Sequence, residues 1–199
     1  MSTQNPRRRY ELKARAEAQE ATRARIAAAA SQLHGEVGVA KTTVSDIARR
    51  AGVQRLTVYN HFPDLEALLP ACTAHWLAEN PMPDFEPSLA IEDPAARLRE
   101  VLTQLYGWYR GNAPMQRRVR GERATVPELD AWMAQSSDQL LAALADSLSA
   151  GLEHPQARAL TALALDFWTW QRLDGEGLDD PTAAELMTGV ACGSTAARA

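Results

Sequence analysis

The sequence of 199 residues contains only 2 cysteines, Cys72 and Cys192, which stand far apart and without the short spacings of metal sites. This scarcity argues against a disulfide scaffold and favours buried free thiols. No apolar run approaches the roughly 20 residues needed to cross a membrane, and the polar start lacks the apolar core of a signal peptide. We therefore expect a cytoplasmic protein.

The sequence also lacks a recognisable catalytic group of residues. It has no phosphate-cradling glycine loop and no nucleophile elbow. Four histidines are scattered without a carboxylate or cysteine at a ligand spacing: His34, His61, His75 and His154. We predict no enzyme activity, no metal and no cofactor, and we interpret His34 as a partly buried structural residue.

The sequence has no overall excess of positive charge, since 21 Lys and Arg stand against 25 Asp and Glu and the net charge is -4, but the charge is unevenly distributed. Residues 1–62 hold 11 Lys and Arg against 5 Asp and Glu, whereas the remainder holds 10 against 20. A basic end attracts phosphate, although charge runs are more often a solvated surface. The basic start, Met1 to Arg9, is expected to be a disordered arm that either reaches a minor groove or only solvates the terminus.

The segment Thr42–Phe62 has the spacing of two short helices around a tight turn. Thr43 can cap the first helix, with Asp46 reaching back to its amide. Gly52 stands where the helix must stop, because glycine takes a positive φ without steric cost. The second helix, from about Gln54, is shaped to enter a major groove. Four apolar residues would pack at the core of this motif: Ile47, Ala48, Val53 and Val58.

With its flanks, this segment resembles the N-terminal domain of the TetR family of transcriptional repressors. The matching residues are Thr22-Arg23-Ala24-Arg25-Ile26, Gly38, Thr42-Thr43-Val44, Thr57-Val58-Tyr59-Asn60-His61-Phe62 and Glu66-Ala67-Leu68. The resemblance implies three regions. Residues 1–20 would be a basic flexible arm and the start of the first helix, residues 21–68 a helix-turn-helix domain with its motif at about 43–62, and residues 69–199 a helical domain for effector binding and dimerisation.

The resemblance also implies which side chains face DNA: Thr43, Gln54, Arg55, Thr57, Tyr59, Asn60 and His61. Arg55 can pair with guanine through two hydrogen bonds, and Gln54 can do so with adenine. Tyr59 and His61 are expected on phosphate groups, which position a protein without reading sequence. Thr43 can contact phosphate from the end of its helix.

Two residues depart from the family pattern. Leu65 stands where a lysine usually approaches a phosphate, so part of the salt-sensitive affinity would be lost. Leu56 stands where small residues are common. It can contact a thymine methyl group or pack against the neighbouring helix, and we favour packing.

Elsewhere, apolar residues recur at steps of three and four, and no strand-like alternation occurs, so the fold is expected to be all α. Asp64 should cap a helix that ends near Glu79. The expected helices are about Glu11–Glu36, a helix opened by Asp93-Pro94, about Gln156–Leu173 and about Thr182–Cys192. The expected breaks are an extended linker at Pro81, Pro83 and Pro87 and punctuation at Gly111 and Pro114. The expected apolar stripes are Ile26, Ala29, Ala30 and Leu33; Leu98, Val101, Leu102, Leu105 and Tyr109; and Leu129, Trp132, Met133, Leu140, Leu144 and Leu148.

The part after residue 68 is rich in aromatic side chains, and relatives in the family enclose an effector there. Plain core packing is the more common role for any single aromatic residue. The predicted effector-binding residues are Trp76, Tyr106, Tyr109, Trp132 and Phe167. Tyr109 and Trp132 are favoured because each carries a polar group.

The last two predicted helices are apolar on more than one face, and in relatives such helices form a four-helix dimer interface. The predicted interface residues are Leu160, Ala164, Trp168, Leu186 and Val190. The extra apolar surface could instead be buried within one monomer.

These features predict a homodimeric transcription regulator that binds double-stranded DNA, most simply a repressor released from a palindromic operator by a small-molecule effector. One alternative is a DNA-binding protein of the same fold without an effector. The other is a helical enzyme or binding protein whose DNA-like domain is incidental.

Overall fold

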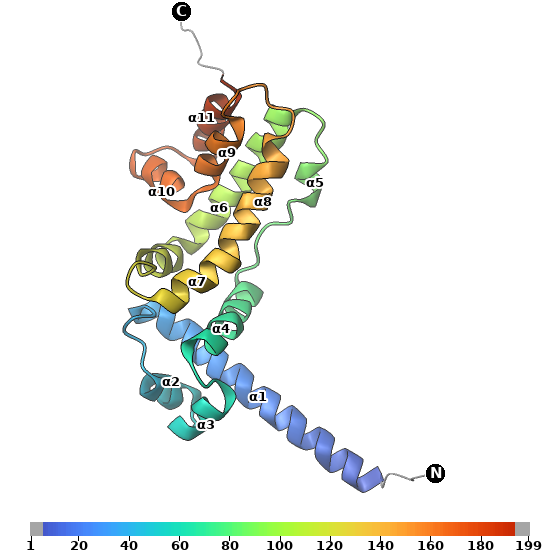
Figure 1. Cartoon of the computed structure of the whole chain (residues 1–199), viewed down its shortest axis with the longest axis vertical. Coiled ribbons are helices and arrows are strands. Elements are labelled where there is room, and N and C mark those ends of the chain that lie inside the picture. Colours follow the sequence, from blue (N-terminus) through green and yellow to red (C-terminus); the bar gives the residue numbers. More distant parts are fainter. Residues whose placement is uncertain (1–5, 194–199) are drawn as a thin grey trace, which may run out of the picture. The chain divides into compact units, whose positions relative to one another are not determined.

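The computed structural model describes residues 6–193, which form helices and no strands, as predicted (Figure 1). None of the described helices is long and apolar enough to cross a membrane. The helices are α1 (Pro6–Val37), α2 (Val44–Ala51), α3 (Arg55–His61), α4 (Leu65–Glu79), α5 (Glu86–Leu89), α6 (Pro94–Gly121), α7 (Pro127–Gln135), α8 (Ser137–Ser149), α9 (Ala157–Leu165), α10 (Phe167–Gly175) and α11 (Asp180–Cys192).

The chain divides into two compact units. The first contains Met1–Asn80 and Arg118–Trp132, and the second contains Pro81–Arg117 and Met133–Ala199. The first unit thus includes all of α4 and the end of α6, whereas the sequence suggests a boundary after residue 68. The reason is that α4 packs along α1.

The core of the first unit forms where α1 crosses α2 and α4. The predicted stripe on α1 is confirmed, since Ile26 and Ala30 are fully buried and Ala29 and Leu33 nearly so. The helix begins at Pro6, earlier than the predicted start near Glu11. Residues 1–5 of the predicted arm lie outside the described part of the chain. Side chains from the next three helices complete this core: Ile47, Ala48, Val58, Phe62, Leu68, Leu69 and Cys72.

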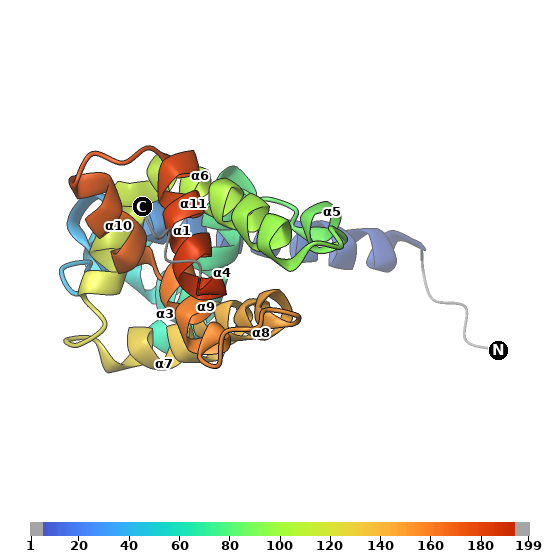
Figure 2. The ribbon, with the colours of Figure 1, turned by 90° about the horizontal axis from the view of Figure 1, so that it is seen from above.

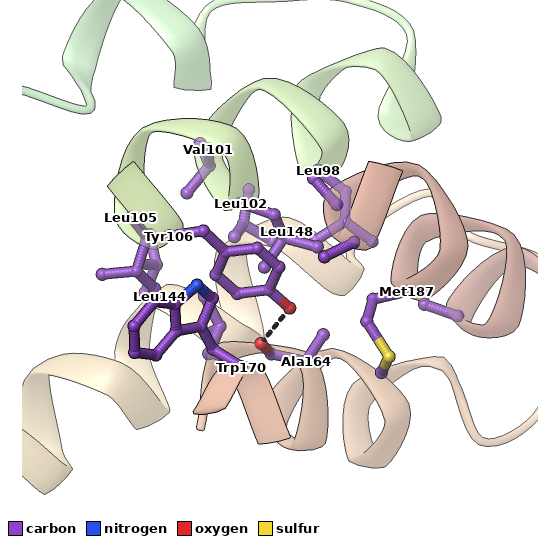
Figure 3. Packing of buried hydrophobic residues seen from close by; sticks show 14 of the residues in the cluster. Leu98, Val101, Leu102, Leu105, Tyr106, Leu144, Leu148, Ala164, Trp170 and Met187 are labelled. Atoms are coloured by element: carbon purple, nitrogen blue, oxygen red, sulfur yellow. Dashed lines mark hydrogen bonds between the residues drawn. The ribbon is translucent and has the colours of Figure 1, made fainter. Parts of the chain in front are cut away.

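In the second unit, α9 packs between α8 and α11 (Figures 1 and 2). The stripe predicted on α6 is confirmed as core: Leu98, Val101, Leu102, Leu105 and Tyr109 are all buried. Figure 3 shows the four aliphatic residues of this stripe together with side chains from α8 to α11, among them Leu148, Ala164, Trp170 and Met187.

The helix predicted from Gln156 to Leu173 is in fact two helices, because Asp166 interrupts it. Its carboxylate accepts hydrogen bonds from the amides of Trp168 (2.7 Å) and Thr169 (3.0 Å) and so caps α10. The carbonyl groups at the end of α9 are satisfied from α6. Tyr106 donates to Ala164 O at 2.8 Å, and Tyr109 donates to Leu165 O at 2.9 Å.

Three further boundaries differ from the prediction. Pro114 does not end α6, which continues to Gly121, and Pro87 opens the short helix α5 inside the supposed extended linker. The stripe from Leu129 to Leu148 belongs to two helices, α7 and α8, which are separated at Ser136. Pro114 disfavours a continuous helix locally, but tertiary packing of the apolar face of α6 outweighs this preference.

His34 is expected to be partly buried, and the structure buries it almost completely, at 4% exposed. Its Nδ1 lies 3.7 Å from Sγ of Cys72, which is a buried free thiol whose pKa burial raises to about 12. Burial lowers the pKa of His34 from 6.5 to about 4, against an opposing effect of the negative charge of Glu122. His34 is therefore neutral at pH 7 in the folded protein.

Acidification should destabilise the first unit through His34. Between pH 6.5 and about 4 the unfolded imidazole binds a proton that the folded one does not, so stability is present above this window and falls as the pH drops through it. We expect a loss of about 2–3 kcal/mol between pH 7 and pH 4.5, measured by urea unfolding. His34→Phe is the matched control and should lose less. Equal losses of stability in the wild type and His34→Phe would contradict the lowered pKa, because His34 would then bind its proton equally well in the folded protein.

Candidate nucleic-acid interface

Thr43 caps the first helix of the motif, α2, as predicted. Its hydroxyl oxygen accepts from the amide of Asp46 at 3.1 Å and donates to the Asp46 carboxylate at 2.5 Å. The hydrogen bond from Thr43, followed by one from Arg49, lowers the pKa of Asp46. The reciprocal cap fixes where α2 starts.

The turn of the motif depends on Gly52, which has φ 67° and ψ 38°. This left-handed conformation is the one predicted, and it favours glycine over residues that carry a Cβ atom. The chain then reverses, and the amide of Val53 donates to the carbonyl of Ala48 at 3.0 Å. The direction of α3 follows from this turn.

The second helix, α3, divides its side chains between core and solvent. Val58 and Phe62 are each 2% exposed, whereas Arg55, Tyr59 and Asn60 are exposed. Of the other predicted DNA-facing residues, Thr43 and Gln54 are exposed, and Thr57 and His61 are half-buried. The predicted DNA-facing residues of α3 and its N-cap are therefore all at least partly exposed, and the helix has one side that faces solvent. The Gln54 side chain makes no capping hydrogen bond to the helix.

Leu56 is also exposed on this helix, at 66%. The expectation that it packs against a neighbouring helix is wrong. Val58 and Phe62, at one helical turn from each other, already fill the side of α3 that faces the core, and Leu56 lies on the other side.

Arg23 of α1 holds the C-terminal end of α3, a role that the sequence does not reveal. Its guanidinium donates to the carbonyl of His61 at 2.9 Å and lies 4.1 Å from the centre of the Phe62 ring. A cation at a helix C-terminus satisfies a free carbonyl group and opposes the negative end of the helix dipole. Nothing local distinguishes Arg23 from the other arginines of α1, because its partners are 38 or more residues away.

Glu122 holds the loop that leads from α1 into α2. Its Oε2 accepts from the amides of Val39 (2.6 Å) and Ala40 (3.1 Å). Gly38 permits this approach, since its φ is +96° and a Cβ atom there would lie 1.9 Å from the Glu122 carboxylate. Nearby, Arg118 donates to the carbonyl of Gly35. The segment after α6 is thus bonded directly to the base of the motif within the first unit, a second set of contacts that the sequence does not indicate.

Two basic residues of α2 are engaged by carboxylates. Arg49 contacts Asp46 at 2.6 Å, and Arg50 donates twice to Glu36 at 2.8 Å. These exposed pairs contribute little to stability.

The predicted effector residues divide between the two units. Trp76 and Trp132 belong to the first, where Trp132 Nε1 donates to Thr73 Oγ1 at 3.2 Å. Tyr106, Tyr109 and Phe167 belong to the second and are core residues, exposed by 1% or less. Both tyrosine hydroxyls are bonded to the backbone, and Phe167 packs edge-on against Tyr109. A ligand could reach these three side chains only by displacing that packing.

Most of the predicted dimer residues lie at the surface of the second unit. Trp168, Leu186 and Val190 are 45%, 47% and 42% exposed, and Leu160 is half-buried. Ala164 is a correction, since it is fully buried within the chain, where α9 faces α6 (Figure 3). The exposed large apolar residue of α9 is Leu163, at 51%. Among the described residues, no cluster of His, Cys, Asp and Glu could hold a metal ion.

A capped helix, a left-handed glycine turn and a second helix with one solvent-facing side define a helix-turn-helix DNA-binding domain. Residues 26–72 match the family model for bacterial regulatory proteins of the tetR family. This part of the chain is therefore similar to the DNA-binding domain of the TetR family, and it carries the fold of that domain. No curated protein matches the chain.

Solved structures share the fold over most of the chain. One, described as a TetR-family transcriptional regulator from Rhodococcus sp., is 20% identical with a TM-score of 0.57, and the match covers 85% of this chain and 95% of that one. A TetR-like transcriptional regulator from Rhodococcus sp. RHA1 is 19% identical with a TM-score of 0.58, covering 87% and 95%. A linker-substituted mutant of HlyIIR is 20% identical with a TM-score of 0.52, covering 88% and 96%.

Removing the contact between Glu122 and the loop before α2 should loosen the base of the motif. Glu122→Gln removes the charge that two amides share, and we expect a loss of about 1–2 kcal/mol in the free energy of unfolding, measured by urea denaturation. Glu128→Gln, on the exposed surface of α7, is the control and should be neutral. Gly38→Ala should be at least as harmful as Glu122→Gln. Wild-type stability of Gly38→Ala would contradict the close approach of Glu122.

Proposed function

We propose that this chain is a homodimeric, sequence-specific DNA-binding regulator that represses transcription from a palindromic operator and is released by a small-molecule effector. The exposed side of α3 in a TetR-type domain carries the proposal. Its support is that Arg55, Tyr59 and Asn60 project into solvent while Val58 and Phe62 hold the helix in place.

In this proposal the side chains of α3 have separate roles. Arg55 and Gln54 contact base edges, where Arg suits guanine and Gln suits adenine. Tyr59, His61 and Thr43 contact phosphate groups and set the position of the helix. The excess of basic residues within residues 1–62 favours approach to DNA, and the acidic remainder discourages adhesion elsewhere on the protein.

Dimerisation is supported by apolar side chains that lie in solvent on α9, α10 and α11. Leu163, Trp168, Leu186 and Val190 are each more than 40% exposed. A twofold contact between two copies would bury them and present two α3 helices to successive major grooves, roughly 34 Å apart. Such a protein acts on DNA in the bacterial cytoplasm.

Arg55→Ala should strongly weaken specific operator binding. An operator selected from random duplexes should bind two wild-type chains. In the variant, the free energy of operator binding, measured by fluorescence anisotropy, should be less favourable by about 1–3 kcal/mol for each half-site. Arg158→Ala, which removes an exposed arginine of α9, is the control and should bind as the wild type does. If no duplex is selected, or if both variants bind equally, the proposed function is wrong.

Effector release implies a reciprocal coupling between the two ligands. For any compound that raises the melting temperature and weakens operator binding, operator DNA should weaken binding of that compound by the same factor. Titration calorimetry with and without operator measures both factors, and unequal factors would rule out this mechanism. The packed state of Tyr106, Tyr109 and Phe167 favours a second candidate, a regulator without an effector, which a screen that finds no such compound would support.

A further inference from the structure

Leu56 is the most exposed large apolar residue of the helix-turn-helix motif, at 66%, followed by Tyr59 at 44%. Leu56, Tyr59 and Asn60 are spaced by three and four residues, so they share one side of α3. This is the side opposite the buried Val58. An apolar side chain therefore stands among the polar groups that the proposed function assigns to DNA.

Leu56 has no hydrogen-bonding group, which limits what it can recognise in a major groove. The bases present donors and acceptors there, and thymine alone adds an apolar group, its 5-methyl. When a leucine packs against a polar base edge, the donors and acceptors of that edge lose their hydration and gain no hydrogen bond in return. An apolar edge has no such cost. The chemistry of the side chain thus selects one base.

We propose that Leu56 reads thymine, by packing its side chain against the 5-methyl group of a thymine in each half-site of the operator. The inference rests on the proposed function and adds a specificity residue to it. Arg55 and Gln54 supply hydrogen bonds to bases, and the adjacent Leu56 supplies an apolar contact. Burial of one methyl group corresponds to about a fourfold change in affinity for each half-site.

Deoxyuridine tests the proposal, because it differs from thymidine only by the missing methyl group. Each thymine of the selected operator is replaced in turn by deoxyuridine, symmetrically in both half-sites, and binding is measured by fluorescence anisotropy. At one position the wild-type protein should bind the uracil operator about sixteenfold more weakly, about fourfold for each half-site, whereas Leu56→Ala should bind the thymine and uracil operators equally. Because Leu56 is exposed, the variant should keep the wild-type melting temperature.

Leu140→Ala is the matched control, since Leu140 is an exposed leucine of α8, at 52%. It should retain the full preference for thymine. The role of Leu56 is overturned if no thymine position shows a penalty, if Leu56→Ala keeps the penalty of the wild type, or if the operator half-site has no thymine. Failure to select any duplex would instead refute the proposed function itself.

Discussion

Burial of one side of α3 is the interaction on which the DNA-binding domain depends. Val58 and Phe62 are held in the core that α1 and α4 supply, and this leaves the opposite side of a seven-residue helix in solvent. A helix so short has little stability of its own. Its position is a property of the packing beneath it, and residues on its outer side are free to vary in chemistry without cost to folding.

The ends of the helices show a second principle, that every buried polar backbone group needs a partner. Arg23 supplies one at the end of α3, Glu122 holds two amides before α2, and two tyrosines of α6 satisfy the carbonyl groups that end α9. These contacts explain why aromatic residues with polar groups occur in the core of the second unit. Their hydroxyls are used for structure in this conformation, so an effector that binds there has to offer a replacement for these hydrogen bonds.

Local chemistry explains which features could be predicted from the sequence. The cap at Thr43, the left-handed turn at Gly52 and the cap at Asp64 depend on residues within a few positions of each other, and all three are confirmed. The exposed residues of α3 follow from the same helical spacing. The break at Asp166 is equally local, but an aspartate within an apolar stretch also fits the surface of a continuous helix, and the tyrosines that make the break possible are more than 50 residues away.

Contacts between distant segments could not be predicted in this way. Glu122 meets Val39 across 83 residues of sequence, and a glutamate after a long helix has no pattern that announces such a partner. Ala164 shows the same difficulty from the other direction. Helical spacing places it on an apolar stripe together with Leu160, but only the position of α6 decides that Ala164 is buried within the chain.

Two groups of apolar side chains remain in solvent on elements that the fold otherwise packs well. One is Leu56 with Tyr59 on α3, and the other is Leu163, Trp168, Leu186 and Val190 on the last three helices. Exposed residues contribute little to folding, so their substitution separates binding from stability in a way that core substitutions cannot. The two groups also differ in their surroundings. Leu56 lies beside Arg55 and Gln54, which suit a polar groove with a single methyl group, whereas the larger group of four suits another apolar surface, such as that of a second copy of the chain.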